Sequence, residues 1–362
     1  MLRRTVKKAI HLFQTAKLSV KASSMYRSGY FAVLSHALAL CREQKFLPEE
    51  AFRLGLFNTN LRPDEFSKYI SRKKLTKIQK ALNPQSWEPL LKNKALFYRY
   101  CMAQGIAVPK LYAVFFKRSA GWSCDGSILA CTDDWVEFFD KSLASEFVIK
   151  PSRGAFGKGV KVFNRQDGGF VDPFSKTYKA LDIYSIMLSD PEHDSFVIQE
   201  RLKNHPEIIR LTDTKHLQTV RMITFLDSGN RCHIIQTHLK LVTGRGITDA
   251  FDHGLTGNMQ ASASLDDGTL RPAATLKLDG SGVKNISAHP KTGICFDQFK
   301  LPMWPRACKL VRDTAPKFLP VRTIGWDVAL TPNGPFIVEG NIWWDPPNHH
   351  RNLDIIINAI SN

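Results

Sequence analysis

The chain has 362 residues, of which 43% are hydrophobic, and a mean hydropathy of −0.20, which is typical of a soluble globular protein with room for two or three domains. A formal net charge of +17 favours acidic partners such as nucleotides, polyanions or anionic membranes. Seven scattered cysteines without a Cys-x-x-Cys motif argue against a disulfide framework or a zinc site, and no apolar run is long enough to span a membrane. These features indicate a reducing, cytoplasmic environment.

Residues 1–86 are predicted to form a basic helical segment. Up to residue 44 its only acid is Glu43, against eight Lys or Arg residues. The apolar stretch near its start is interrupted by His11, Gln14 and Lys17, so it lacks the hydrophobic region of a signal peptide. A solvated helical cap, an amphipathic helix on an anionic membrane and an organellar transit peptide remain open as interpretations.

Residues 87–142 are expected to combine helices with a short strand. A helix is predicted over residues 92–104 and a strand over 111–115. Thr132 begins another helix with acids in its first turn, where the helix dipole favours them. From residue 143 onward, strand-like runs separated by turn signals predominate, which predicts an α+β fold with an antiparallel sheet.

A glycine-rich loop follows the strand predicted over residues 146–150. Its glycines allow backbone N–H groups to point into one concavity that suits phosphate oxygens, and basic side chains add positive charge. The residues concerned are Lys150, Arg153, Gly154, Gly157, Lys158 and Gly159. The spacing is neither that of a Walker loop nor that of the dinucleotide-binding fingerprint, so a phosphate-binding loop and a mobile surface hairpin both remain open.

Three later strands carry polar residues that need an explanation. The strand over 196–200 ends in Gln199 and Glu200, where backbone groups are suited to an adenine edge; an ordinary strand end is the alternative. Alternation places Arg221 on an otherwise apolar face, so it requires an anionic partner, which is either a ligand or a structural salt bridge. Lys240 presents the same case one strand later.

Residues 325–341 are predicted to form two strands joined by a tight turn. Pro332-Asn333-Gly334 suits a three-residue loop, and the resulting register places Asp327 opposite Glu339, with Asn341 on the same face. The apolar residues behind this face are Val328, Leu330, Phe336 and Val338. Because opposed like charges destabilise a sheet, two carboxylates and a carboxamide predict a site for a hard divalent cation; a solvated acidic hairpin is the alternative.

In this order, the elements resemble the ATP-grasp superfamily and, more narrowly, its sugar-transfer-associated branch, which is similar to glutamate-ligase-like proteins. The resemblance covers about residues 90–350. It rests on Lys150-Pro151 with Gly154 to Gly159, Gln199-Glu200, Asn204-His205-Pro206, Thr219-Val220-Arg221, and Gly325-Trp326-Asp327 through Glu339-Gly340-Asn341. It implies an ATP-grasp fold whose two α+β subdomains grip ATP, with residues 143–201 as the lid and 202–362 as the core, after the pre-ATP-grasp region 87–142.

The resemblance also implies roles for individual residues. Lys150 matches the lid lysine that reaches the α and β phosphates of ATP, and Lys94, or the adjacent Lys92, matches an earlier phosphate-binding lysine. Glu200 matches the hinge acid beside adenine and ribose. Arg221 matches the arginine that contacts the transferred phosphoryl group, and Lys240 is a looser candidate for the same contact. The residues that match magnesium ligands are Asp327, Glu339 and Asn341.

The implied activity is an ATP-dependent carboxylate–amine ligation in polysaccharide or glycoconjugate synthesis. Two alternatives are an ATP-dependent phosphotransferase with a hydroxyl acceptor and a non-catalytic basic protein that binds a nucleotide or polyanion. ATP, Mg²⁺ and a small carboxylate or sugar-linked substrate are the expected ligands, and nucleic acid is not expected. Contact of the basic N-terminal segment with an anionic membrane remains open, and the sequence does not specify the oligomeric state.

Other polar and aromatic residues have both a functional and a structural interpretation. Asp249, Asp252 and His253 are candidates for an acceptor pocket or for a polar loop. His349-His350 either close over the site or belong to a surface loop. Trp343-Trp344 are core residues or a platform for a sugar.

Overall fold

The computed structural model describes residues 2–62, 69–154, 157–244, 246–251, 255–280 and 282–345. The helices are α1 (Leu2–Tyr26), α2 (Tyr30–Glu43), α3 (Pro48–Arg53), α5 (Arg72–Leu82), α6 (Glu88–Lys92), α7 (Lys94–Ala103), α8 (Thr132–Glu137), α9 (Ala180–Ser189), α10 (Pro206–Thr212) and α11 (Trp304–Thr314). Of the positions that have two interpretations, Asp252, His253 and His349-His350 lie outside the described residues.

The described strands form two sheets, of eight and seven strands. The first has the order β3-β2-β1-β8-β4-β5-β6-β7, with β1 (Leu111–Phe116), β2 (Gly121–Ser123), β3 (Ile128–Leu129), β4 (Glu146–Pro151), β5 (Lys161–Gln166), β6 (Gly169–Val171), β7 (Thr177–Tyr178) and β8 (Ser195–Glu200). The second has the order β13-β12-β11-β10-β9-β14-β15, with β9 (Thr219–Leu226), β10 (Cys232–Leu241), β11 (Met259–Ala263), β12 (Leu270–Leu276), β13 (Val283–Ile286), β14 (Thr323–Thr331) and β15 (Gly334–Asn341).

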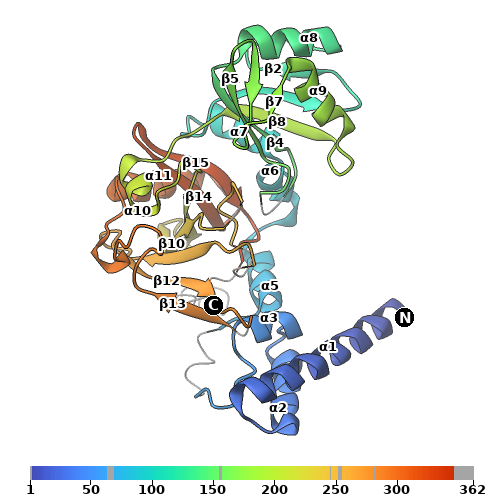
Figure 1. Cartoon of the computed structure of the whole chain (residues 1–362), viewed down its shortest axis with the longest axis vertical. Coiled ribbons are helices and arrows are strands. Elements are labelled where there is room, and N and C mark those ends of the chain that lie inside the picture. The colour runs from blue at the N-terminus through green and yellow to red at the C-terminus, as the bar shows by residue number, and fades with distance from the viewer. Residues whose placement is uncertain are drawn as a thin grey trace.

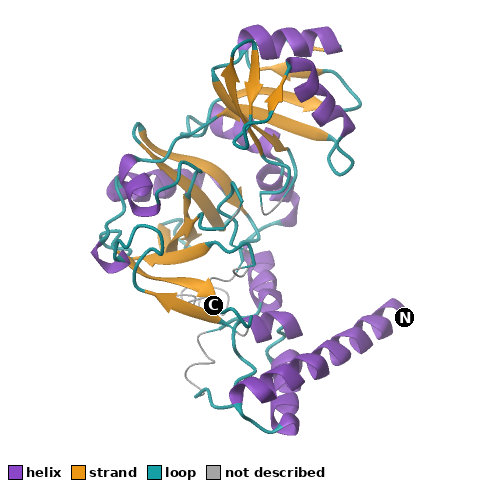
Figure 2. Ribbon diagram, viewed as in Figure 1, coloured by secondary structure: helices purple, strands orange, loops and turns teal. Residues whose placement is uncertain are grey.

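The two sheets and the N-terminal helices follow one another along the molecule. Figures 1 and 2 show the first sheet at one end, the second sheet in the middle and α1, α2 and α3 at the other end. Neighbouring strands pair in antiparallel fashion throughout the described residues, which confirms the predicted α+β class. The strands β1 to β3, from the region expected to precede the lid, share one sheet with β4 to β8.

The first sheet has its own aromatic core. Phe147 of β4 and Phe163 of β5 are a cross-strand pair with ring centroids 5.4 Å apart, and both are fully buried. Phe139 and Trp135 pack on the same side. Aromatic side chains bury a large apolar area and have few rotatable bonds. This cluster therefore gives the first sheet a hydrophobic core of its own.

The hairpin of β14 and β15 departs from the predicted turn but keeps the predicted facing pair. Thr331 pairs with Gly334, so the loop has two residues rather than three, and the Thr331 hydroxyl donates to the Gly334 carbonyl at 2.8 Å. A bulge at Val338 then shifts the register by one residue, so that Asp327 faces Glu339 as predicted. The Val338 carbonyl accepts a hydrogen bond from the Tyr98 hydroxyl at 2.7 Å, which fixes the bulge.

The bulge also changes which apolar residues lie behind the hairpin. Val328 and Leu330 are buried as expected, but in β15 the buried aliphatic side chain is that of Ile337, whereas Phe336 and Val338 are half-buried. Val338 instead lines a cavity beside Glu339. The reason is that an extra residue inverts the alternation of side chains along a strand.

The end of α5 is tied to both strands of this hairpin through Asn83. Its Nδ2 donates to the carbonyls of Thr323 and Ile342 at 2.9 and 3.1 Å, and its Oδ1 accepts from the amides of Arg322 and Thr323 at 3.0 Å. The side chain is 1% exposed, so all of its hydrogen-bonding groups are satisfied inside the protein. Gln79, one turn earlier, donates to the carbonyl of Trp344 at 2.8 Å.

We expect Asn83→Ala to lower the free energy of unfolding by about 3 kcal/mol, because it leaves buried amides and carbonyls without partners. Urea unfolding followed by tryptophan fluorescence measures the change. The matched control is Asn58→Ala, which removes one acceptor for the Asn60 amide near the surface and should cost less than about 1 kcal/mol. Equal effects of the two substitutions would show that the Asn83 tether contributes nothing specific.

Candidate active site

A cavity of about 1010 Å³ lies between the two sheets. The first sheet contributes Lys150 and the loop after it, together with Gln199 and Glu200. The second sheet contributes residues of β9, β10, β14 and β15, and α6 and α7 close one side. All of the sequence-predicted site residues except Gly159 line this cavity.

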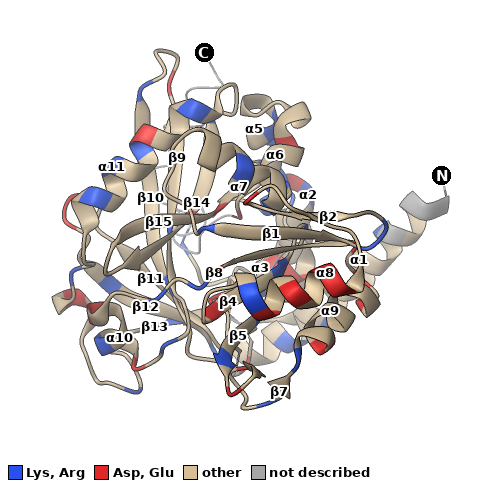
Figure 3. Cartoon of the chain, turned by 90° about the horizontal axis from the view of Figure 1, so that it is seen from above, with Lys and Arg blue, Asp and Glu red and all other residues tan. Residues whose placement is uncertain are grey.

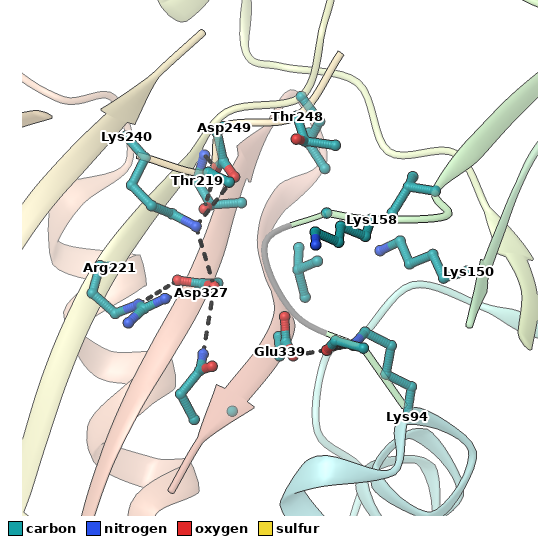
Figure 4. Close-up of a pocket in the computed structure, with 18 of the residues that line it drawn as sticks. Lys94, Lys150, Lys158, Thr219, Arg221, Lys240, Thr248, Asp249, Asp327 and Glu339 are labelled. Atoms are coloured by element: carbon teal, nitrogen blue, oxygen red, sulfur yellow. Dashed lines mark hydrogen bonds and ion pairs between the residues drawn. The ribbon is translucent and has the colours of Figure 1, made fainter. Parts of the chain in front are cut away.

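A row of polar side chains crosses four strands of the second sheet at the cavity. His238 of β10 pairs with Arg221 of β9, Arg221 pairs with Asp327 of β14, and Asp327 pairs with Glu339 of β15. Residues that pair directly across a sheet project from the same face. The row therefore brings an imidazole, a guanidinium and two carboxylates to one face of the sheet. Figure 4 shows Arg221, Asp327 and Glu339 along it.

Asp327 is the most heavily paired member of the row. Its Oδ1 accepts from Nε of Arg221 at 2.5 Å and its Oδ2 from Nη2 of Arg221 at 3.1 Å, while Nζ of Lys240 lies 3.2 Å from Oδ2. Burial raises the pKa of the Asp327 carboxyl, but Arg221 and Lys240 lower it by more, so the group stays ionised. The anionic partner that the sequence required for Arg221 is thus Asp327 itself.

Lys240 joins this pair to a second carboxylate, Asp249. Its Nζ lies 3.2 Å from Oδ1 of Asp249, and Oδ2 of Asp249 accepts from the amide and the hydroxyl of Thr219 at 2.8 and 2.5 Å. Burial lowers the pKa of Lys240, but Asp249 and Asp327 raise it above its ordinary value. The Lys240 ammonium is therefore charged and held in place from two sides.

Glu339 has a different partner, Lys94 at the start of α7. Nζ of Lys94 lies 3.1 Å from Oε1 of Glu339, and the backbone amide of Lys94 donates to the carbonyl of Ser152 at 2.7 Å. This second bond ties α7 to the loop after β4. Lys92 instead pairs with Glu88 and is about half exposed, so Lys94 is the lysine that the fold brings to the carboxylate row.

Lys150, at the end of β4, has no such partner. The residue is 9% exposed, and its ammonium forms no hydrogen bond or ion pair with any residue that the structure describes. Burial and the nearby charge of Lys94 lower the pKa of Lys150 to about 8. The carboxylates of Glu339, Asp249 and Asp327 raise this pKa, but by less. A buried ammonium that lacks a counter-ion favours the binding of an anion.

The glycine-rich loop approaches the second sheet at Gly157. Gly157 has a φ of +70°, and a Cβ there would lie 2.5 Å from Oγ1 of Thr248. Only glycine therefore allows the loop to lie this close to the opposite wall of the cavity. Arg153 and Lys158 are exposed on the loop, and Figure 4 shows Lys158 next to Lys150.

Gln199 and Glu200 end β8 at the hinge between the sheets. Oε2 of Glu200 accepts from the amide of Lys110 at 3.0 Å, so the carboxylate is anchored to the chain before β1. Oε1 of Gln199 is buried and has no hydrogen-bond partner among the described residues. Since Gln199 lines the cavity, this acceptor is available to a ligand donor such as an amine or hydroxyl.

The donor set of the hairpin fits a magnesium ion that also holds phosphate. Each carboxylate oxygen has two lone pairs, so Asp327 and Glu339 keep acceptor capacity beyond their ion pairs. Nδ2 of Asn341 faces the Gly325 carbonyl at 3.2 Å, which leaves its Oδ1 as an acceptor. No group of three His, Cys, Asp or Glu side chains suited to a metal occurs in the described ranges, so further ligands would come from phosphate and water.

Some site residues escaped the sequence analysis. His238 lies two residues before Lys240 and shares its face, so alternation alone was a usable signal for it. Thr219 belongs to the Thr219-Val220-Arg221 motif, but its bond to Asp249, 30 residues away, had no signal in the sequence. Trp344 is buried in the apolar cluster beside α5, and Trp343 is partly buried against the main core; both also line the cavity.

Comparison with solved structures finds distant likenesses. The chain is 12% identical to the L-amino acid ligase from Bacillus licheniformis, over 70% of this chain and 40% of that one, with a TM-score of 0.36. It is 13% identical to the D-alanine–D-alanine ligase from Bacillus anthracis, over 75% and 66% of the two chains (TM-score 0.39), and 10% identical to the biotin carboxylase from Campylobacter jejuni, over 75% and 46% (TM-score 0.44). The chain thus spans less than two thirds of each.

A search of curated proteins found no match. The family model described as sugar-transfer associated ATP-grasp matches residues 73–346, which is more than half of the chain and begins earlier than the resemblance at about residue 90 suggested. The match takes in α5, whose Asn83 tethers the carboxylate-bearing hairpin, as well as both sheets. The chain therefore belongs to the sugar-transfer associated ATP-grasp family.

Proposed function

We propose that the protein is an ATP-dependent ligase that couples a carboxylate to an amine. A carboxylate oxygen of the substrate attacks the γ-phosphorus of ATP, and the bond from that phosphorus to the bridging oxygen breaks, which gives an acyl phosphate and ADP. The amine then attacks the acyl carbon, phosphate leaves with the former carboxylate oxygen, and the amine proton is released. The family description supports a role in polysaccharide or glycoconjugate synthesis.

The observation that carries this proposal is the uncompensated positive charge at the cavity. Both carboxylates of the row are already paired with a cation, yet Lys150 is buried and has no partner within the described ranges. A triphosphate would supply the missing negative charge. Charge that builds up on phosphoryl oxygens during transfer is stabilised best by fixed cations in a site shielded from water.

Each charged residue then has a definite task. Lys150 and Lys94 bind phosphate oxygens, and Lys94 exchanges its bond to Glu339 for one to phosphate. Arg221 holds Asp327 through Nε and Nη2, which leaves Nη1 to contact the transferred phosphoryl group. Asp327, Glu339 and Asn341 would hold Mg²⁺, which would supply positive charge to neutralise the phosphates. Gln199 and Glu200 face the nucleoside from the hinge.

The first test is Mg²⁺-dependent ADP formation with a panel of carboxylates and amines. We expect Glu339→Gln to lower the rate at least about 100-fold, because the substitution removes a charged ligand but keeps the shape. Glu88→Gln, which alters another cavity-lining glutamate paired with a lysine, is the matched control and should keep the rate. A stable amide product supports the ligase.

Two results would contradict this proposal. If ADP forms together with a stable phosphorylated hydroxyl compound and no amide, the protein is a phosphotransferase. If Glu339→Gln and Glu88→Gln behave alike, the carboxylate row does not take part in the reaction.

The second test uses the cost of keeping Lys150 charged. Its pKa of about 8 lies below the ordinary lysine value, so the folded state binds its proton more weakly than the unfolded state. At neutral pH this destabilises the fold by up to about 3 kcal/mol, and the penalty disappears as the pH rises from 8 towards 10.5.

We therefore expect Lys150→Met to raise the thermal midpoint at pH 7 while it abolishes ATP binding in calorimetric titration. The gain in stability should shrink at pH 10, where the wild-type lysine is largely neutral. Lys92→Met, at an exposed lysine of the same cavity, serves as the control and should leave both quantities unchanged. A destabilised Lys150→Met protein would mean that Lys150 has a structural role.

A further inference from the structure

The helix α1 exposes large apolar side chains along one face. Val6, Ile10, Phe13 and Val20 are 53%, 50%, 71% and 58% exposed. Their spacings of four, three and seven residues place them on a single stripe of an α-helix. Lys17 lies within the same stripe and is also exposed.

The opposite face of α1 packs against the rest of the protein. Thr15, Ser19 and Ala22 are buried, and Ala22 belongs to the apolar cluster formed with α2 and α3. In a surface helix the large apolar residues normally face the protein and the small or polar ones face water. In α1 the apolar residues Leu18, Met25 and Tyr26 do pack against that cluster, but the stripe of large apolar side chains on the other face is left uncovered by the described part of the chain.

The charge of α1 specifies what partner the uncovered stripe fits. Its 25 residues include six Lys or Arg and no Asp or Glu. Lys8 and Lys17 are exposed and make no ion pair with the residues that the structure describes. Acids lie on other elements, such as α8, whose first turn carries Asp133 and Asp134 (Figure 3). A second copy of this helix would bring like charges together, whereas an anionic surface would not.

We propose that α1 docks on an anionic lipid bilayer, with the apolar stripe in the region between headgroups and acyl chains and the lysines on lipid phosphates. The helix lies in the plane of the surface, as a basic amphipathic helix does. No helix in the described ranges is both long and apolar enough to cross a bilayer. The inference does not depend on the proposed ligase activity.

Docking through α1 is compatible with an open cavity. The helix projects from the end of the molecule that lies farthest from the first sheet (Figure 1). The residues that line the cavity begin at Arg72, so none belongs to α1. A membrane-bound protein therefore keeps access to its cavity between the sheets.

The test is co-sedimentation of the full chain with vesicles of phosphatidylcholine alone or mixed with phosphatidylglycerol. We expect binding to the mixed vesicles that weakens as salt increases. The double substitution Ile10→Asp with Phe13→Asp should lower the affinity at least about tenfold, because it removes two inserted apolar side chains. Lys8→Glu with Lys17→Glu should lower it on mixed vesicles as well.

The matched control is Phe174→Asp with Leu278→Asp, which alters two apolar residues outside α1 that are at least as exposed as Ile10 and Phe13, and it should bind as the wild type does. Absence of wild-type binding, equal binding to both vesicle types, or equal binding by the α1 double variant would each overturn the proposal. So would a dimer in light scattering that the α1 substitutions dissociate, because the stripe would then join two copies. Unchanged thermal midpoints establish that the variants are folded.

Discussion

The opposition of Asp327 and Glu339 on neighbouring strands is the constraint on which the cavity depends. Two carboxylates that face each other across a hairpin repel, and the fold compensates with cations from three separate elements. Arg221 and Lys240 come from the neighbouring strands β9 and β10 and hold Asp327, whereas Lys94 comes from α7 and holds Glu339. The pairing thereby links α7 and the second sheet into one wall of the cavity, and the amide of Lys94 extends the link to the loop after β4.

The positive charge at the cavity is larger than is needed to neutralise the two carboxylates. Lys150 is buried beside them without a partner among the residues that the structure describes, and burial lowers its pKa. A protein selected only for stability would replace such a lysine with an apolar residue. Its position beside the glycine-rich loop is what we expect of an anion-binding site, and the triphosphate of the proposed ATP substrate would satisfy that requirement.

Local patterns predicted much of this from the sequence. Turn signals and alternation predicted the antiparallel strands, and they placed Asp327 opposite Glu339 although the turn was wrong, because the bulge at Val338 restores the register that a longer loop would have produced. Contacts between distant segments were not predictable in this way. The local sequence does not show that Lys94 rather than Lys92 pairs with Glu339, and it does not predict the hydrogen bonds of Asn83. Both sets of contacts depend on how α5 and α7 pack against the hairpin.

A crystal structure of the protein with Mg²⁺ and a non-hydrolysable ATP analogue would show directly whether the cavity holds a nucleotide. We expect the triphosphate in the cavity between the sheets, with phosphate oxygens on Lys94 and Lys150 and the metal on Asp327, Glu339 and Asn341. A nucleotide bound elsewhere, or a metal that leaves the Lys94–Glu339 pair intact and touches neither carboxylate, would contradict it.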